Sequence, residues 1–178
     1  ISAGAKVTLV YGPGEEKPPN GAKIINVLSS KEMLNAVKIE LKKKFDIVIM
    51  TAAIADYIPT NPSKKKIKSS KNEIKISLKK APKIIDQIKK LQKNVLLVGF
   101  KAETNLTKNQ LIKSAQKKLK ESSSDMIVAN DIGSSRYKKN PQNNQVIIVD
   151  AEKVVISKWM NKQKIAKFIK KQIEQKIK

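Results

Sequence analysis

Four short apolar runs, each followed by small or polar residues, constrain the fold of this chain more than any other feature. They are Ala5–Tyr11, Asp46–Thr51, Val95–Phe100 and Met126–Ala129. Runs of this length that are rich in Val and Ile, and continuous rather than alternating in hydrophobicity, are typical of parallel-sheet strands covered on both faces. The chain is therefore predicted to be an α/β protein with a mostly parallel sheet.

Helices are predicted between these strands, because parallel strands need crossover connections. Ser29 and Glu32 fit a capping box, and a helix with one apolar face extends from there to about Lys44. Pro82, which suits a first helical turn, begins a helix that continues to about Lys93. The remaining predicted elements are a helix over Thr104–Glu121 capped by Thr104 or Asn105, a last helix capped by Asn161, and a short strand over Lys23–Leu28.

Two segments depart from this alternation. Glu73–Leu78 alternates strictly between polar and apolar residues, which is typical of a half-exposed strand in an antiparallel element. Thr60–Lys71, just before it, is rich in Pro, Ser and Lys and is predicted to be a flexible loop. Gln145–Asp150 and Lys153–Ser157 flank a tight turn and predict a hairpin. The other predicted loops are Ala52–Pro59 and Gly133–Asn144.

Composition excludes several kinds of chemistry. The 178 residues include no Cys and no His, so thiol nucleophiles, disulfides and His-based triads or metal ligands are excluded. The net charge is +23, yet Arg136 is the only arginine and aromatic residues make up 4%. Readers of nucleic acids favour Arg forks and aromatic platforms, so the charge indicates a lysine-biased surface rather than a nucleic-acid interface. No apolar run approaches the roughly 20 residues of a membrane span.

Candidate ligand-binding residues lie at the ends of the predicted strands, because open parallel sheets bind ligands at their carboxyl edge. The four strand ends are Gly12-Pro13-Gly14, residues 51–57, residues 99–104 and Ala129-Asn130-Asp131. Their polar residues are Asp56, Glu103, Thr104, Asn130 and Asp131. Any one of these segments alone is equally well explained as ordinary turn chemistry. Gly12-Pro13-Gly14 is an incomplete phosphate-binding pattern, since residue 17 is Lys, and is interpreted as a turn.

An ordered set of motifs resembles the phosphopantothenate–cysteine ligase family, also called phosphopantothenoylcysteine synthetase. The set comprises residues 52–57 (AAIADY), 66–68 (KIK), 78–82 (LKKAP), 99–104 (GFKAET), 129–131 (AND) and 144–146 (NQV). No single motif is decisive, but their order is specific, and the resemblance covers nearly the whole chain from Gly4 onward.

The resemblance implies a Rossmann-like enzyme of coenzyme A biosynthesis. Members of the family activate the carboxylate of 4′-phosphopantothenate with CTP, form an acyl-cytidylate and release pyrophosphate. The cysteine amine then attacks, which yields the amide and CMP. Mg²⁺ is implied as the partner of the phosphates. The resemblance further implies a cytoplasmic homodimer, association or fusion with a flavin-dependent decarboxylase domain, and no nucleic-acid or membrane partner.

The resemblance also implies roles for particular residues. Lys66 matches a loop lysine that stabilises the acyl-phosphate. Met50, Thr51 and Ala52 match a segment that offers backbone groups to the cytosine, and Asp56 matches an aspartate of the nucleotide site. The remaining nucleotide contacts that it implies are Pro82, Lys83, Ile84 and Ile85 at a helix start, Phe100 against the base, and Lys118 toward the triphosphate.

The chain departs from the family pattern at three places. Ala81-Pro82-Lys83 stands where Asn-Pro-Asp is usual, so a side-chain role for that aspartate is lost. Ser122 stands where a second basic residue is usual, so Lys117 or Lys120 would have to substitute. We expect a single synthetase domain over residues 1–178 that lacks the family's first strand, glycine-rich turn and most of the first helix, with residues 57–80 forming a flexible loop and dimerisation strand.

Two other functions fit parts of the sequence. An NAD(P)-binding or other nucleotide-binding Rossmann-like protein without ligase activity would share the fold, but it would need a complete glycine-rich turn. A basic nucleic-acid-binding protein would show affinity that falls steeply with salt.

Overall fold

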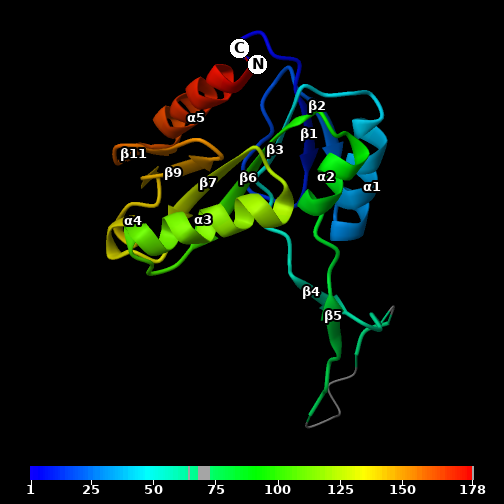
Figure 1. Ribbon diagram of the computed structural model, residues 1–178. Coiled ribbons are helices and arrows are strands. Elements are labelled where there is room, and N and C mark those ends of the chain that lie inside the picture. The colour runs from blue at the N-terminus through cyan, green and yellow to red at the C-terminus, as the bar shows by residue number, and fades with distance from the viewer. Residues whose placement is uncertain (64, 68–72, 178) are drawn as a thin grey trace. The chain divides into compact units, whose positions relative to one another are not determined.

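The structure of the protein is a computed structural model that describes residues 1–63, 65–67 and 73–177. The chain forms two compact units. Unit 1 contains Ile1–Glu40 and Ala52–Ile84, and unit 2 contains Leu41–Thr51 and Ile85–Lys178. Each unit is described by itself below (Figure 1).

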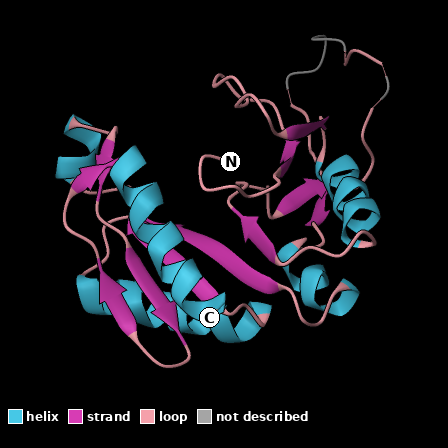
Figure 2. Cartoon of the chain, turned by 90° about the horizontal axis from the view of Figure 1, so that it is seen from above, coloured by secondary structure: helices cyan, strands magenta, loops and turns pink. Residues whose placement is uncertain are grey.

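Unit 2 is built on a five-stranded sheet with the order β10-β9-β7-β6-β3 (Figure 2). Strands β3, β6 and β7 are parallel, whereas β9 is antiparallel to β7 and β10 is antiparallel to β9. The strands are β3 (Ile47–Met50), β6 (Leu96–Glu103), β7 (Met126–Asp131), β9 (Ile147–Asp150) and β10 (Val154–Ile156). The predicted α/β class and the C-terminal hairpin are therefore confirmed.

Helices cover both faces of this sheet because residues along a strand point alternately to either side. Met126 and Val128 of β7 pack with Ile165 and Ile169 of α5 (Lys162–Ile177). The intervening Ile127 and Ala129 pack with Leu111 and Ala115 of α3 (Lys108–Ser122) on the opposite face. The near-continuous apolar runs of the central strands thus serve two separate cores.

Helix α2 (Ile85–Leu91) packs on the α3 face at a glycine. A Cβ atom on Gly99 would lie 2.8 Å from Ile127 Cδ1 and 2.9 Å from Ile85 Cδ1, so the lack of a side chain lets the helix approach β6. The loop predicted over 133–144 contains a short helix, α4 (Ser135–Lys139), and β8 (Asn143–Asn144), which pairs with β11 (Met160–Asn161). Asn161 caps α5 as predicted, since its Oδ1 accepts the N–H of Lys164 at 2.9 Å.

Unit 1 holds two small sheets. Strands β1 (Thr8–Tyr11) and β2 (Lys23–Asn26) pair in parallel and form a sheet of their own, whereas the apolar runs predict a single mostly parallel sheet. Helix α1 (Ser30–Leu41) follows, and the predicted Ser29–Glu32 pair caps its start: Glu32 N–H donates to Ser29 Oγ at 3.2 Å, while the Glu32 carboxylate accepts the N–H of Leu28, rather than of Ser29, at 2.9 Å. An ion pair of 2.9 Å between Lys23 and Glu40 ties this helix to β2.

The antiparallel excursion is confirmed, but its strands are not where the alternation placed them. Strand β4 (Tyr57–Pro59) pairs with β5 (Leu78–Lys80), and residues 73–77 are not in a strand. The Ala52–Pro59 segment, predicted to be a loop, thus ends in a strand. Alternation alone misplaced β5 because the partner strand, which is only three residues long, decides where pairing occurs. Lys64 and residues 68–72 of the predicted loop lie outside the described residues.

Two helix starts were also misplaced. Helix α2 begins at Ile85 rather than at Pro82. Helix α3 is capped by Thr107 rather than by Thr104 or Asn105, because Asn105 adopts a left-handed conformation with φ of 56° that precedes the helix. Thr107 and Gln110 form a full capping box, which was the signal missed in the sequence. Among the described residues, none of the helices combines the length and the apolar character needed to cross a bilayer.

Candidate functional site at the carboxyl edge

The carboxyl ends of β3, β6 and β7 meet at one edge of the unit 2 sheet, because the three strands are parallel. The register of β3 with β6 ends at Met50 opposite Gly99. The register of β6 with β7 continues to Glu103 opposite Asp131. The last four residues of β6 therefore extend past the end of β3, and this overhang of residues 100–103 is the most distinctive feature of the edge.

A charged cluster occupies the α3 side of the overhang. Glu103 Oε1 accepts a hydrogen bond from Ser114 Oγ of α3 at 2.6 Å and lies 3.2 Å from Lys101 Nζ. The Ser114 hydrogen bond is the main reason that the pKa of Glu103 lies below its ordinary value; partial burial opposes it, and Lys101 adds to it. Glu103 is therefore a carboxylate at neutral pH, fixed from the body of a helix.

The loops that follow β6 and β7 are fastened to each other. Asp131 Oδ1 accepts the N–H groups of Asn105 at 3.0 Å and Gly133 at 2.8 Å. A Cβ atom on Gly133 would lie 2.7 Å from the backbone nitrogen of Asn105, so only glycine fits this approach. Asp131, predicted from the sequence to lie at the ligand-binding edge, thus holds the two loops together. A strand-end pattern does not reveal this structural role.

Five of the predicted site residues lie in unit 2. Met50 is half-buried at the end of β3, and Thr51 follows it, exposed. Ile85 is buried at the start of α2 and approaches Gly99. Lys118 is half-buried on α3, on the same face as α2, whereas Phe100 packs with the α5 core on the opposite face. Ile85 and the helix that carries Lys118 therefore lie on one face of the sheet, and the ring of Phe100 lies on the other face.

The other predicted residues lie in unit 1. The Ala81 N–H donates to the Asp56 carbonyl at 2.8 Å, which brings Asp56 beside the Ala81–Lys83 segment. Ala52, Asp56, Lys66, Pro82 and Lys83 are exposed, and Ile84 is buried. Exposure leaves the Asp56 carboxylate and the two lysine ammonium groups accessible to a ligand.

Ser122 is unavailable as a ligand contact. Its Oγ donates to the Lys118 carbonyl at 2.7 Å and lies 2.7 Å from Ser124 Oγ, and its side chain is buried. Of the two suggested substitutes for a basic residue at this position, Lys117 pairs with Glu121 at 3.8 Å and Lys120 is exposed. Within the described part of the chain, no group of three or more acidic residues is arranged to hold a metal ion.

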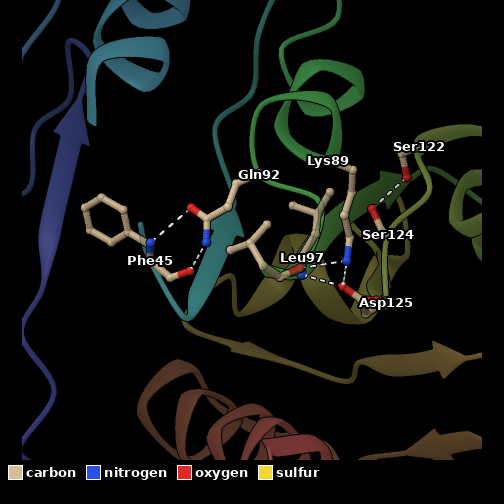
Figure 3. Close-up of polar contacts among 8 residues, drawn as sticks. Phe45, Lys89, Gln92, Leu97, Ser122, Ser124 and Asp125 are labelled. Atoms are coloured by element: carbon tan, nitrogen blue, oxygen red, sulfur yellow. Dashed lines mark hydrogen bonds and ion pairs between the residues drawn. The ribbon is translucent and has the colours of Figure 1, made fainter. Parts of the chain in front are cut away.

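A second polar network lies at the opposite, amino edge of the same sheet (Figure 3). Lys89 Nζ lies 2.6 Å from Asp125 Oδ2, which also accepts the Leu97 N–H at 2.6 Å. Gln92 pairs with both backbone groups of Phe45, accepting its N–H at 3.0 Å and donating to its carbonyl. These side chains connect the starts of β3, β6 and β7, so we interpret this network as structural. The candidate site is therefore the carboxyl edge.

Comparisons with known proteins agree with this picture. The family model of the DNA/pantothenate metabolism flavoprotein C-terminal domain matches residues 1–177. The coenzyme A biosynthesis bifunctional protein CoaBC of Thermococcus kodakarensis is 37% identical over 172 residues, covering 96% of this chain and 41% of that protein. The crystal structure of the C-terminal domain of a CoaBC protein superimposes with a TM-score of 0.79 at 30% identity, covering 99% of this chain and 78% of the other. A Cab2 mutant in complex with phosphopantothenate-cysteine shares the fold, with a TM-score of 0.60 at 18% identity over 81% of this chain and 48% of the other.

The fold and its polar carboxyl edge define an α/β protein of the class that binds ligands at the ends of parallel strands. Within that class, the chain belongs to the DNA/pantothenate metabolism flavoprotein C-terminal domain family. The family resemblance noted in the sequence is thereby confirmed. The chain spans about two fifths of the length of the CoaBC relatives that it matches.

Proposed function

We propose that this protein is a phosphopantothenate–cysteine ligase of coenzyme A biosynthesis that uses CTP. The observation that carries the proposal is the match of 96% of the chain, at 37% identity, to a CoaBC protein. A structural neighbour that holds phosphopantothenate-cysteine supports the same substrate class. The CoaBC relatives are bifunctional proteins, which supports association or fusion with a flavin-dependent decarboxylase domain.

The proposed reaction has two steps. A carboxylate oxygen of 4′-phosphopantothenate attacks the α-phosphorus of CTP, and pyrophosphate leaves as the acyl-cytidylate forms. The cysteine amine then attacks the acyl carbon, loses a proton, and expels CMP. Mg²⁺ supplies charge neutralisation at the phosphates when it is bound. A chain without His or Cys suits this chemistry, because the nucleophiles arrive with the substrates and the protein positions them.

The residues of this chain have distinct proposed tasks. Met50, Thr51 and Ala52 present backbone groups to the base, and Asp56 binds the nucleotide. Segment 82–85 contacts the nucleotide, Lys118 reaches the triphosphate, Phe100 lies against the base, and Lys66 stabilises charge on the activated acyl group. Exposure of Asp56, Lys66 and Lys83 supports these assignments, because each charged group is accessible. We further propose a cytoplasmic homodimer that pairs through residues 57–80.

Calorimetric titration with Mg²⁺ and CTP tests the nucleotide site. We expect wild type to bind CTP, Asp56→Ala to weaken binding at least tenfold, and the exposed control Asp46→Ala to leave it unchanged. Equal CTP binding by all three proteins, or by none, would refute the assigned pocket. Release of pyrophosphate from CTP only when phosphopantothenate is added distinguishes the ligase from a nucleotide-binding protein without ligase activity.

A further inference from the structure

We infer that Lys101, held in place by Glu103, is a phosphate-binding residue of the carboxyl edge. Ser114 and Glu103 act as positioning residues for its ammonium group. This inference rests on the proposed function, whose two larger substrates, CTP and 4′-phosphopantothenate, both carry phosphate. The match to the family's motifs assigns no role to any of the three residues.

The position of Lys101 is the first argument. Lys101 lies on the overhang of β6, two residues past the end of the register with β3 at Gly99. On its other side, β6 is still paired with β7, where Lys101 is opposite Ala129. A residue at this point lies beyond the end of β3, next to Met50 and Thr51, which present backbone groups to the base in the proposed function. Ligands of open parallel sheets bind at such strand ends.

The way the ammonium group is held is the second argument. Lys101 Nζ lies 3.2 Å from Glu103 Oε1, and the side chains are 37% and 26% exposed. The same carboxylate oxygen accepts the Ser114 Oγ hydrogen bond of 2.6 Å, so a chain of contacts runs from the middle of α3 to the ammonium. The lysine–glutamate pairs at Lys117–Glu121 and Lys170–Glu174 are far more exposed helix-surface pairs of the kind that contribute little.

The chemistry of the cluster points to a strongly charged anion. The ammonium has three protons, and one carboxylate oxygen engages only part of that capacity. Asp131, on the neighbouring strand, is already engaged by two backbone N–H groups. Because Glu103 engages only part of this capacity, it can hold Lys101 in place while a ligand binds the remaining N–H groups. An ammonium that is partly neutralised attracts a phosphate with a charge near −2 more strongly than a single carboxylate.

Calorimetry with three probes tests the inference: inorganic pyrophosphate, CTP with Mg²⁺, and 4′-phosphopantothenate. We expect Lys101→Gln to raise the Kd of at least one probe about tenfold, as loss of one charge-assisted contact predicts. Lys101→Arg should restore binding to within about threefold, because it keeps the charge. Lys113→Gln, which removes an exposed lysine next to Ser114 in the sequence of α3, is the matched control and should leave every Kd unchanged.

Glu103→Gln separates positioning from folding. The amide retains an acceptor for Ser114 and loses the charge that orients Lys101, so we expect Kd to rise about threefold with an unchanged midpoint of thermal unfolding. A purely structural Glu103 would instead lower that midpoint and leave Kd unaltered. Loss of pyrophosphate and CTP binding in Lys101→Gln would assign the nucleotide phosphates, and loss of phosphopantothenate binding alone would assign the 4′-phosphate.

Several outcomes would overturn the inference. One is that Lys101→Gln binds all three probes like wild type while CTP and phosphopantothenate binding persist, which leaves the proposed function intact. Another is an equal loss of binding in Lys101→Gln and Lys113→Gln, which indicates diffuse electrostatics.

The same titrations separate the inference from the proposed function. If wild type binds pyrophosphate through Lys101 but binds neither substrate, the phosphate contact stands and the proposed function fails. If no probe binds wild type, both fail.

Discussion

At the scale of single residues, a charge pair with a buried carboxylate fixes the C-terminal helix. The Asp150 side chain is 1% exposed; it accepts the N–H groups of Glu152 and Lys153 at 2.8 and 2.9 Å and pairs with Lys176 of α5 at 3.2 Å. A buried carboxylate is costly unless its oxygens are engaged. Here the two N–H groups, the hydrogen bond from Lys176 and the positive charge of Lys176 compensate for burial. The pair therefore holds the end of α5 against the hairpin of β9 and β10.

Removing the cation of this pair should destabilise the fold. Lys176→Met leaves Asp150 buried beside its two N–H donors but without a counter-charge, and we expect a loss of about 2 kcal/mol in the free energy of unfolding. Lys170→Met is the matched control, since Lys170 pairs with Glu174 on the exposed face of the same helix at 3.0 Å. Its expected effect is below about 0.5 kcal/mol. Equal losses in urea unfolding would contradict a special role for Asp150–Lys176.

The same residue predicts a dependence of stability on pH. Burial by itself raises the pKa of Asp150, but the two N–H groups and Lys176 outweigh burial and hold this pKa below the ordinary 3.8. A carboxyl whose pKa is lowered by folding contributes stability above its ordinary pKa and loses it as the pH falls through the folded value. The difference in unfolding free energy between wild type and Asp150→Asn should thus be full at pH 7 and shrink below about pH 4. A difference that stays constant down to about pH 2 would count against this assignment.

Residue-scale prediction from sequence succeeded where a pattern is local. Ser29 with Glu32 and the cap at Asn161 were predicted, because capping residues and their partners are within four positions of each other. For α3 the sequence favours Thr104 or Asn105 as the cap, whereas the structure places the cap at Thr107 with Gln110 as its capping-box partner. What decided between them was the turn after β6, where Asn105 is fastened to Asp131 of another strand. That constraint is tertiary, so the local sequence offers caps at Thr104, Asn105 and Thr107 without deciding between them.

At the scale of elements, two glycines set how closely segments of unit 2 approach. At Gly99 an added Cβ would meet the flexible ends of the Ile85 and Ile127 side chains. At Gly133 it would meet the backbone of Thr104 and Asn105, at 2.8 and 2.7 Å. Side-chain ends can rotate away, whereas backbone can move only if the loop after β6 moves with it.

These glycines should therefore respond differently to substitution. We expect Gly99→Ala to cost about 1 kcal/mol and Gly133→Ala about 3 kcal/mol, the two ends of the usual range for overpacking. Shortening a neighbour should restore Gly99→Ala, so the double variant with Ile127→Val should recover part of the loss. Chemical denaturation of the four proteins measures this, and a larger cost at Gly99 than at Gly133 would show that the approach of α2 is the more rigid one.

The elements themselves were largely predictable, and their ends were not. All four continuous apolar runs contain a strand, but only β6 and β7 are largely buried as predicted, whereas β1 and β3 are no more than half-buried. Strand β6 nevertheless extends to Glu103, past the predicted end at Phe100, since β7 offers it a partner that far. The alternating segment 73–78 failed as a strand for the opposite reason: its antiparallel partner β4 pairs with residues 78–80 instead.

At the scale of the whole molecule, the excursion of unit 1 exposes an unusual number of large apolar side chains. Tyr57, Ile74, Ile76 and Leu78 are between 50% and 65% exposed. Single exposed hydrophobic residues are normal, but a concentration within one segment is typical of a surface that contacts another chain. This exposure supports the proposed homodimer.

Charge placed on this segment should abolish dimerisation. We expect wild type to have the mass of a dimer in light scattering, and Ile76→Lys combined with Leu78→Lys to have the mass of a monomer. Ile177→Lys, a substitution of an equally exposed residue at the end of α5, is the control and should remain dimeric. A monomeric wild type, or a double variant that stays dimeric, would refute pairing through residues 57–80.

The sequence by itself determined the α/β class, the order of the main strands and helices, and the family, because each of these depends on composition and on patterns a few residues long. Tertiary structure alone decided that β1 and β2 pair in their own sheet, that Phe100 lies on the face opposite α2 and α3, and that Ser122 is buried in the end of α3. It also joined Lys101, Glu103 and Ser114, of which the sequence had noted only Glu103. Contacts of this kind depend on register and on which face a residue occupies, and a shift of one residue reverses the face.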